Sequence, residues 1–227
     1  MATNRKETFT SPAGKALYPK LQEADTKFKP EGEFSVKLLL TEAQAAPFLE
    51  QCESAQEEAF QEKLEELKAK KPKMNAAKLA EEIKRAPLPV KPHTDPETGE
   101  ETGEWAVHFK AKASGTTKSG ERWERKIPMY DAKNQPISGK LPTMWSGSML
   151  KVNYVVDPFC TALGAGVTLR IQAVQILKLV SGGARSAEEY GFEAEEGGYT
   201  YSEADMPEDG HIPFAADDAA DAGQEDF

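Results

Sequence analysis

The sequence predicts a mainly β fold, a small antiparallel barrel that carries a helical insertion and an acidic C-terminal tail. Three observations predict it. Several segments alternate apolar and polar residues with the period of two that β-strands show. One block, residues 41–71, is instead rich in Ala, Glu, Gln, Lys and Leu, which favour helices. From Ser181 to Phe227, 14 acidic residues accompany one basic residue, and so acidic a segment cannot bury enough apolar surface to fold.

The first strands are expected near the N-terminus. Residues 7–21 have the composition of short extended pieces, and residues 33–41 place an apolar side chain at every second position. Pro30 and Gly32 predict a turn between the two.

A helical insertion, about residues 42–86, is expected next. Thr41 can cap the first helix, with Gln44 three residues later completing a capping box, and Pro72 ends that helix. A second short helix is expected over residues 75–85. Residues 87–104, rich in Pro, Gly and charged residues, predict a polar loop.

The strands then return. Residues 105–114 alternate cleanly, 115–120 predict a turn, and 121–131 are expected to be the hairpin partner. Residues 148–159 and 164–180 predict two more strands. Five or six strands with helices inserted after the second suit a small, strongly coiled antiparallel barrel.

The parity of these strands predicts a basic face. Opposite the apolar side chains, four strands carry Lys37, Lys110, Lys112, Lys151 and Arg170, together with His108, and no Asp or Glu. One interpretation is a solvated face on which lysines discourage pairing with another sheet. The other is a surface that follows a phosphate backbone.

Aromatic residues lie among the cations and favour the second interpretation. Trp123 is followed by Arg125 and Lys126, and Phe159 ends a strand beside Pro158. Tyr18 and Phe28 also have lysine neighbours. Unpaired bases stack on flat rings while cations hold phosphates, so this combination is typical of proteins that bind single-stranded nucleic acid.

Other classes of function are disfavoured. The residues show no Ser-His-Asp arrangement, no glycine-rich phosphate loop and no metal-ligand spacing among the three histidines, so we expect no enzyme, cofactor or metal. We also expect a cytoplasmic location, because the sequence has no apolar run of membrane-spanning length and no signal-peptide segment. The net charge of −10 divides into +3 for residues 1–180 and −13 for residues 181–227.

The ordered set of segments resembles the single-stranded DNA-binding proteins of podoviruses of the T-odd coliphage type. The resemblance is carried by FTSPAGKALYP, by the helical block that leads into KRAPLPVKP, and by SMLKVNYVVDPFCTALGAGVTLRIQAVQILKLV. It extends to the acidic tail closed by phenylalanine. The resemblance implies an OB-fold, a small Greek-key barrel, in residues 1–180, and a disordered tail in residues 181–227.

The resemblance also implies a function. Proteins of this type bind single-stranded DNA without sequence preference and protect and anneal it in viral DNA replication, recombination and repair. A homodimer, a host-cytoplasmic location and tail contacts with the phage DNA polymerase and helicase-primase are implied as well. By position, Lys110, Lys112, Lys151, Tyr154 and Phe159 match the family's sheet segments, and Phe227 matches its terminal aromatic residue. The step after Phe159 is shorter here and lacks a further aromatic residue.

The acidic tail is itself a candidate interaction arm. Its last eleven residues, DDAADAGQEDF, include the candidate partner-binding residues Asp217, Asp218, Asp221, Glu225, Asp226 and Phe227. We expect the carboxylates to occupy the basic face when DNA is absent, with the terminal ring in place of a base. A tail that only adds solubility is the simpler alternative. A DNA-mimic inhibitor or interaction protein, which would act through its acidic surface, and a DNA-modifying enzyme are the alternative functions.

Overall fold

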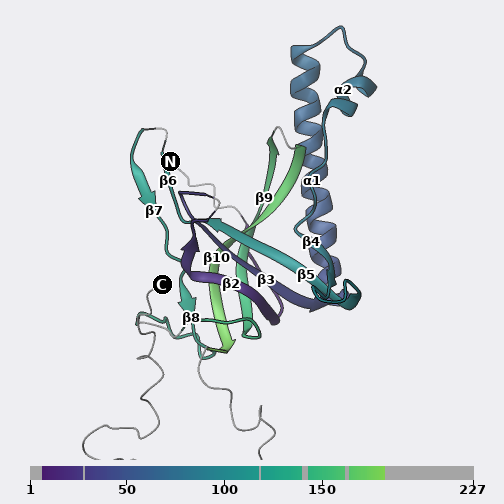
Figure 1. Cartoon of the computed structure of the whole chain (residues 1–227). Coiled ribbons are helices and arrows are strands. Elements are labelled where there is room, and N and C mark those ends of the chain that lie inside the picture. The colour runs from purple at the N-terminus through teal and green to yellow at the C-terminus, as the bar shows by residue number, and fades with distance from the viewer. Residues whose placement is uncertain (1–6, 28, 118, 140–142, 162–163, 182–227) are drawn as a thin grey trace, which may run out of the picture. The chain divides into compact units, whose positions relative to one another are not determined.

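The computed structural model describes residues 7–181 except 28, 118, 140–142 and 162–163. The fold is mainly β, as predicted, with helices between the third and fourth strands (Figure 1). In chain order the elements are β1 (Phe9–Thr10), β2 (Gly14–Asp25), β3 (Glu33–Thr41), α1 (Glu42–Lys70), α2 (Ala76–Glu82), β4 (Val90–Thr94), β5 (Glu101–Lys112), β6 (Ser114–Thr116), β7 (Arg122–Glu124), β8 (Met129–Tyr130), β9 (Met149–Thr161) and β10 (Gly164–Lys178).

Five strands close into a ring. β2 pairs with β3 and β3 with β5, both antiparallel, and β5 pairs with β10 in parallel. β10 then pairs with β9, and β9 returns to β2, both antiparallel. The sheet therefore closes on itself as a barrel, and the register shift between Ile171 and Ala173 marks a bulge where β10 bends.

The barrel encloses the apolar side chains that alternate along its strands. Fully buried residues include Leu38, Val107, Phe109, Leu150, Val152, Leu169 and Ile171. Helix α1 covers one end of this core, where the Phe48 ring packs edge-on against Phe109, with 6.0 Å between centroids. The long strands thus bury one face and leave the other outside.

The start of α1 follows the capping rule. The backbone N–H of Thr41 donates to Gln44 Oε1 at 3.1 Å, as the capping box predicts. The apolar stripe of the helix, which includes Phe48, Cys52 and Ala55, is buried against the strands. The predicted first helix is therefore confirmed.

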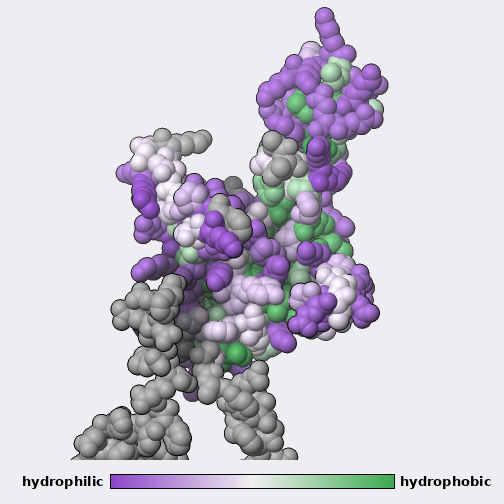
Figure 2. Space-filling model, viewed as in Figure 1, coloured by the Kyte–Doolittle hydropathy of each residue, from purple (hydrophilic) through white to green (hydrophobic). Residues whose placement is uncertain are grey.

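The outer turns of α1 form a hairpin with α2, which extends beyond the strands (Figure 1). A second apolar cluster holds the hairpin together and includes Leu64, Leu79 and Ile83. Asn75 caps α2 by accepting a hydrogen bond from the Ala77 N–H at 3.1 Å. The surface over α2 and the outer end of α1 is largely hydrophilic (Figure 2).

The predicted polar loop over residues 87–104 is wrong in part. β4 pairs antiparallel with β5, and the turn between them is closed by Asp95, whose Oδ1 accepts from the Glu97 N–H at 2.8 Å. Gly99 supplies the left-handed conformation, with φ of 73°. β4 contains Pro92, which interrupts the alternation but is tolerated on an edge strand.

The predicted pairing of residues 105–114 with 121–131 is also wrong for most of its length. β5 is hydrogen-bonded to β3 on one side and to β4 and β10 on the other, so no edge is left for a further strand. Only the short β6 and β7 form the expected hairpin, as a separate two-stranded sheet. β8 instead pairs with β10.

Neither α1 nor α2 is long and apolar enough to cross a membrane. Residues 182–227 lie outside the described residues, so the expected boundary near residue 180 stays a prediction.

Replacement of Phe109 tests how much the contact between the barrel and α1 contributes to stability. Its side chain is fully buried and its ring centroid lies 5.2 Å from that of Tyr154. Phe109→Ala is expected to lower the free energy of unfolding by about 3–5 kcal/mol because it leaves a cavity that the strands cannot fill. Urea unfolding measures the change, with exposed Glu97→Ala as a control expected within about 0.5 kcal/mol of the parent. A loss below about 1 kcal/mol for Phe109→Ala would show that Phe109 does not anchor the core.

Candidate nucleic-acid interface

A groove lies on the outer face of the barrel and is called the basic groove here. It encloses about 430 Å³ and is lined by Lys37, Pro87, Leu88, Pro89, Lys91, Ala106, His108, Lys110, Phe159, Val167 and Thr168. β3, β4, β5 and β10 supply its cations and floor. Residues 87–89, which follow the helical hairpin, supply an apolar wall, and Phe159 of β9 lies beside it.

Strand register explains why the predicted cations meet. Lys37 of β3 is paired with His108 of β5. On the other side of β5, Lys110 is paired with Arg170 of β10. Since paired residues project from the same face of a sheet, the side chains of Lys37, His108, Lys110, Lys112 and Arg170 share the outer face, as strand parity predicts.

The apolar wall is fixed by hydrogen bonds from the core. Gln56 of α1, a buried polar residue, donates to the Ala86 carbonyl at 2.7 Å and to the Ala165 carbonyl at 3.0 Å. The His108 backbone N–H donates to the Pro89 carbonyl at 2.8 Å. The helical insertion therefore positions one side of the basic groove.

The middle of the basic groove is a strongly cationic environment. Burial and the positive charges of Lys110, Lys37 and Lys91 lower the pKa of His108 to about 4, against an opposing effect of Glu33. His108 is thus neutral at physiological pH and belongs to the groove as a polar, not a charged, group. Lys37 and Lys91 have no carboxylate partner among the residues that the structure describes.

The outer face is not free of acids, which corrects the sequence interpretation. Glu33 is the first residue of β3 and Asp157 lies within β9, and each stands just beyond the stretch of its strand whose parity was compared. Glu33 pairs with Lys110 at 3.1 Å, and Asp157 pairs with Arg170. Burial alone would raise the pKa of Glu33, but hydrogen bonds from Lys29 and Lys110 lower it below its ordinary value.

Phe159 lies at the edge of the basic groove because its partner in the sheet is a glycine. It is paired with Gly166, and a Cβ atom at residue 166 would lie 2.6 Å from Phe159 Cζ. The ring therefore packs directly on the β10 backbone, in space that only glycine leaves open. It is half-buried, so part of the ring is available to a ligand.

The β6–β7 hairpin carries a second group of predicted residues. Trp123 packs on Gly115 of the paired strand, with the Arg125 guanidinium 5.7 Å from its ring centroid. Burial and the charge of Arg170 lower the pKa of Arg125, which places the base of this hairpin close to the barrel's basic face. Lys126 follows and is exposed.

The prediction that Tyr154 contacts DNA is wrong, because its ring belongs to the core. It is 4% exposed, its centroid lies 5.4 Å from that of Phe48, and its hydroxyl bonds Gln51 Oε1 at 3.1 Å. Burial raises its pKa to about 12. The ring cannot stack on a base, because apolar side chains occupy both its faces.

Lys151 does not line the basic groove. It is paired with Gln175, near the point where β8 joins β10. From residue 151 to residue 159 an extended strand covers roughly 26 Å at about 3.3 Å per residue, so Lys151 and Phe159 are at different ends of β9. The candidate tail residues lie outside the described residues.

Lys91 is a groove residue that the sequence interpretation missed. It follows the buried Val90 on β4, and Pro92 comes next, so the alternation is too short to indicate a strand. Its pairing with Ala106 of β5 places it beside His108. Lys91 is placed in the groove by the pairing of β4 with β5, and the residues of β4 alone do not reveal that pairing.

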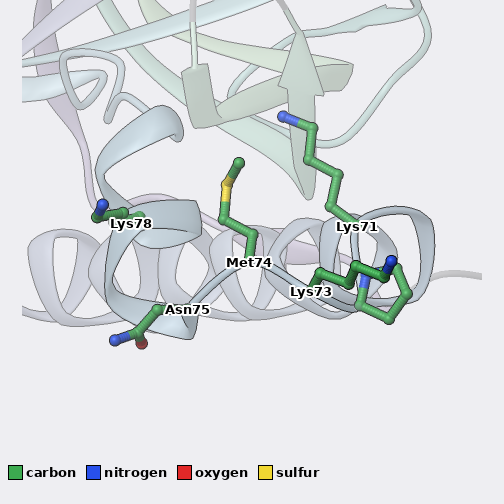
Figure 3. Close-up of a pocket in the computed structure, with 6 residues that line it drawn as sticks. Lys71, Lys73, Met74, Asn75 and Lys78 are labelled. Atoms are coloured by element: carbon green, nitrogen blue, oxygen red, sulfur yellow. The ribbon is translucent and has the colours of Figure 1, made fainter.

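The helical hairpin has a basic concavity of its own, of about 730 Å³, lined by Lys71, Pro72, Lys73, Met74, Asn75 and Lys78 (Figure 3). It lies at the turn between α1 and α2, and its lining includes no aromatic residue. Lys71 is held by Glu82 at 2.7 Å. This concavity therefore lacks an aromatic ring of the kind that Phe159 adds to the cations of the basic groove.

A closed β-barrel with a cationic outer groove and an aromatic edge defines a class of protein suited to an extended polyanion. The chain belongs to the family "Single-stranded DNA-binding protein, Bacteriophage T7", whose model matches residues 13–179. This confirms the resemblance noted from the sequence.

Relatives in this family cover almost the whole chain. The chain is 27% identical over 223 residues to the single-stranded DNA-binding protein of Enterobacteria phage T3, covering 92% of each. It is 25% identical over 238 residues to that of Escherichia phage T7, covering 97% of this chain and 98% of the relative. The crystal structure of gp2.5, a single-stranded DNA-binding protein encoded by bacteriophage T7, matches with a TM-score of 0.62 and 26% identity, over 87% of this chain and all of that one.

The depressed pKa of His108 predicts an acid-sensitive fold. An unfolded histidine titrates near 6.5, so between about pH 6.5 and 4 the unfolded chain binds a proton that the folded chain does not. The stabilisation from a neutral His108 is complete above pH 6.5 and is lost as the pH falls towards 4. Urea unfolding at pH 7 and pH 5 is expected to show a smaller loss of stability for His108→Gln than for the parent. His93→Gln is the control for removal of a histidine outside the groove, and equal losses in all three proteins would contradict the assignment.

Proposed function

We propose that this protein binds single-stranded DNA without sequence preference along the basic groove. The observation that carries the proposal is that Lys37 and Lys91, which have no carboxylate partner among the described residues, line one groove together with the partly exposed Phe159. The lysines hold phosphates, and the ring offers a stacking surface that accepts any base. Family membership supports the same function, since the relatives from phages T3 and T7 are single-stranded DNA-binding proteins.

The ring of strands supports an OB-fold for the barrel. Its order, β2–β3–β5–β10–β9, places the last strand between the third and the fourth, as a five-stranded Greek-key barrel does. In such barrels the face of the second and third strands binds oligonucleotides. Here those strands are β3 and β5, which carry Lys37, His108 and Lys110.

The two ion pairs give the groove a mechanism for binding by exchange. Arg170 and Lys110 are held by Asp157 and Glu33 before a ligand arrives, so they are already oriented along the face. A phosphate can then share or replace the carboxylate. Trp123, Arg125 and Lys126 of the β6–β7 hairpin extend the contacts beyond Arg170.

The biological role follows from such binding. A protein that covers single strands without reading their sequence protects them in viral replication, recombination and repair, and a second copy on a complementary strand promotes annealing. A homodimer is part of the proposal, as is recruitment of the phage DNA polymerase and helicase-primase by the acidic tail when DNA has displaced it from the groove. A DNA-mimic inhibitor is disfavoured, because an acidic mimic has no use for a basic groove.

The salt dependence of binding tests the groove directly. Oligo-dT titrations followed by tryptophan fluorescence are expected to give an affinity that falls steeply with salt, with a log–log slope of about −0.7 for each phosphate contact. Lys37→Gln and Lys91→Gln are each expected to make that slope shallower by about 0.7. Lys73→Gln, in the concavity of the helical hairpin, is the matched control and is expected to leave the slope unchanged. If all three variants keep the parental slope, the bound DNA does not follow the basic groove.

Truncation tests the proposed competition by the tail. Deletion of residues 217–227 is expected to tighten binding to oligo-dT at low salt, because five carboxylates and the terminal Phe227 no longer compete for the groove. The gain is expected to vanish in Lys37→Gln/Lys91→Gln protein and to shrink at high salt. Pull-down of the polymerase is expected to be lost with the truncation. An unchanged or weaker affinity for DNA after truncation would refute the competition.

A further inference from the structure

Two aromatic side chains on the outside of the barrel are not accounted for by the basic groove. Tyr18 of β2 is 63% exposed and Trp145, in the segment before β9, is 55% exposed. Burying an aromatic side chain is favourable, so two large rings left in water on neighbouring segments indicate a surface that a ligand covers.

Hydrogen bonds hold the two segments together. The Tyr18 backbone N–H donates to Ser146 Oγ at 2.9 Å, and the Gly147 N–H donates to the Ala16 carbonyl at 2.8 Å. The Trp145 N–H in turn donates to the Val180 carbonyl at 2.8 Å. Tyr18 and Trp145 are therefore displayed from backbone that is fixed before any ligand binds.

The backbone at Tyr18 is strained in a way that presents its ring. Tyr18 has φ of 48°, the left-handed region that a bulky residue rarely adopts, and the register of β2 shifts between Leu17 and Lys20. A strained conformation that the neighbouring hydrogen bonds enforce is often found at functional sites.

Lys37 connects this surface to the basic groove. Its Nζ lies 5.9 Å from the centroid of the Tyr18 ring, and the same side chain lines the groove beside His108. β2 lies next to β3 in the barrel (Figure 1). A DNA single strand that crosses β5 and then β3 along the groove therefore reaches Tyr18 of β2 next.

The surroundings select an anionic ligand. Within residues 8–22, 34–41 and 143–156, which include Tyr18, Lys37 and Trp145, the charged residues are Lys15, Lys20, Lys37 and Lys151, and the nearest acids in sequence border these stretches. Cations beside exposed rings are the combination that binds unpaired bases and their phosphates. A protein partner held by apolar contact alone would not require it.

We propose that Tyr18 and Trp145 form a second base-stacking site, which holds the single strand after it leaves the basic groove past Lys37. The inference rests on the proposed function and extends it. A short oligonucleotide fills the groove alone, whereas a longer one also covers Tyr18 and Trp145. Sites of about 4–16 nucleotides are known for barrels of this size, so the second site lies within reach of one barrel.

Oligonucleotide length separates the two sites. Trp145→Ala and Tyr18→Gly are each expected to weaken binding of oligo-dT of about 16 nucleotides by roughly five- to hundredfold and to leave binding of about 4 nucleotides unchanged. Glycine accepts the left-handed backbone at residue 18, so Tyr18→Gly removes the ring without adding strain. Tyr130→Ala removes an exposed ring on β8 and is the matched control, expected to bind both lengths like the parent.

A spectroscopic signal tests the contact itself. In a Trp105→Phe/Trp123→Phe reporter, which keeps an aromatic ring at the proposed contact of residue 123, Trp145 is the remaining tryptophan. Its fluorescence is expected to be quenched by the long oligonucleotide and not by the short one. Equal weakening at both lengths would mean that Trp145 acts through the groove, and would overturn the second site. The second site would also be overturned if Trp145→Ala and Tyr18→Gly bound both lengths like the parent and the reporter showed no quenching, while the salt slope of DNA binding stayed parental. Failure of the parent protein to bind either length would instead refute the proposed function.

Discussion

The pairing of β9 with both β2 and β10 is the constraint on which the rest of the structure depends. It closes the sheet, and closure separates an inner face that only apolar side chains can fill from an outer face that is free for polar ones. Because β5 lies between β3 and β10, the cations of three strands then meet on one curved surface. Without closure these side chains would lie along an open, twisted sheet.

The helical insertion supports this surface through contacts made by α1. The Phe48 ring covers the end of the core, while Gln56 holds the backbone of residues 86 and 165 in place. Both residues lie on α1, whose buried stripe is set by helical spacing. A helix that does not line the groove thus holds the backbone that leads into the apolar wall of residues 87–89.

Much of this could be predicted from local pattern, and the remainder could not for identifiable reasons. The alternation along 105–114 and the capping residue Thr41 are local signals, and both proved reliable. Lys91 was missed because the strand that presents it is defined by its partner and not by its own alternation. Tyr154 was misplaced because its assignment followed family position, although its parity with Leu150 and Val152 already put it inside. Glu33 and Asp157 escaped notice because parity was compared only over residues 34–40 and 148–156, and each acid stands one residue beyond.

The two carboxylates on the outer face have a consequence for how tightly any polyanion is held. Glu33 pairs with Lys110 and Asp157 pairs with Arg170, so a phosphate that binds either cation exchanges one anionic neighbour for another. Such an exchange releases only the difference between two similar attractions. We therefore expect a modest gain in affinity from each of these two contacts, which would make a polyanion bound as proposed easy to displace.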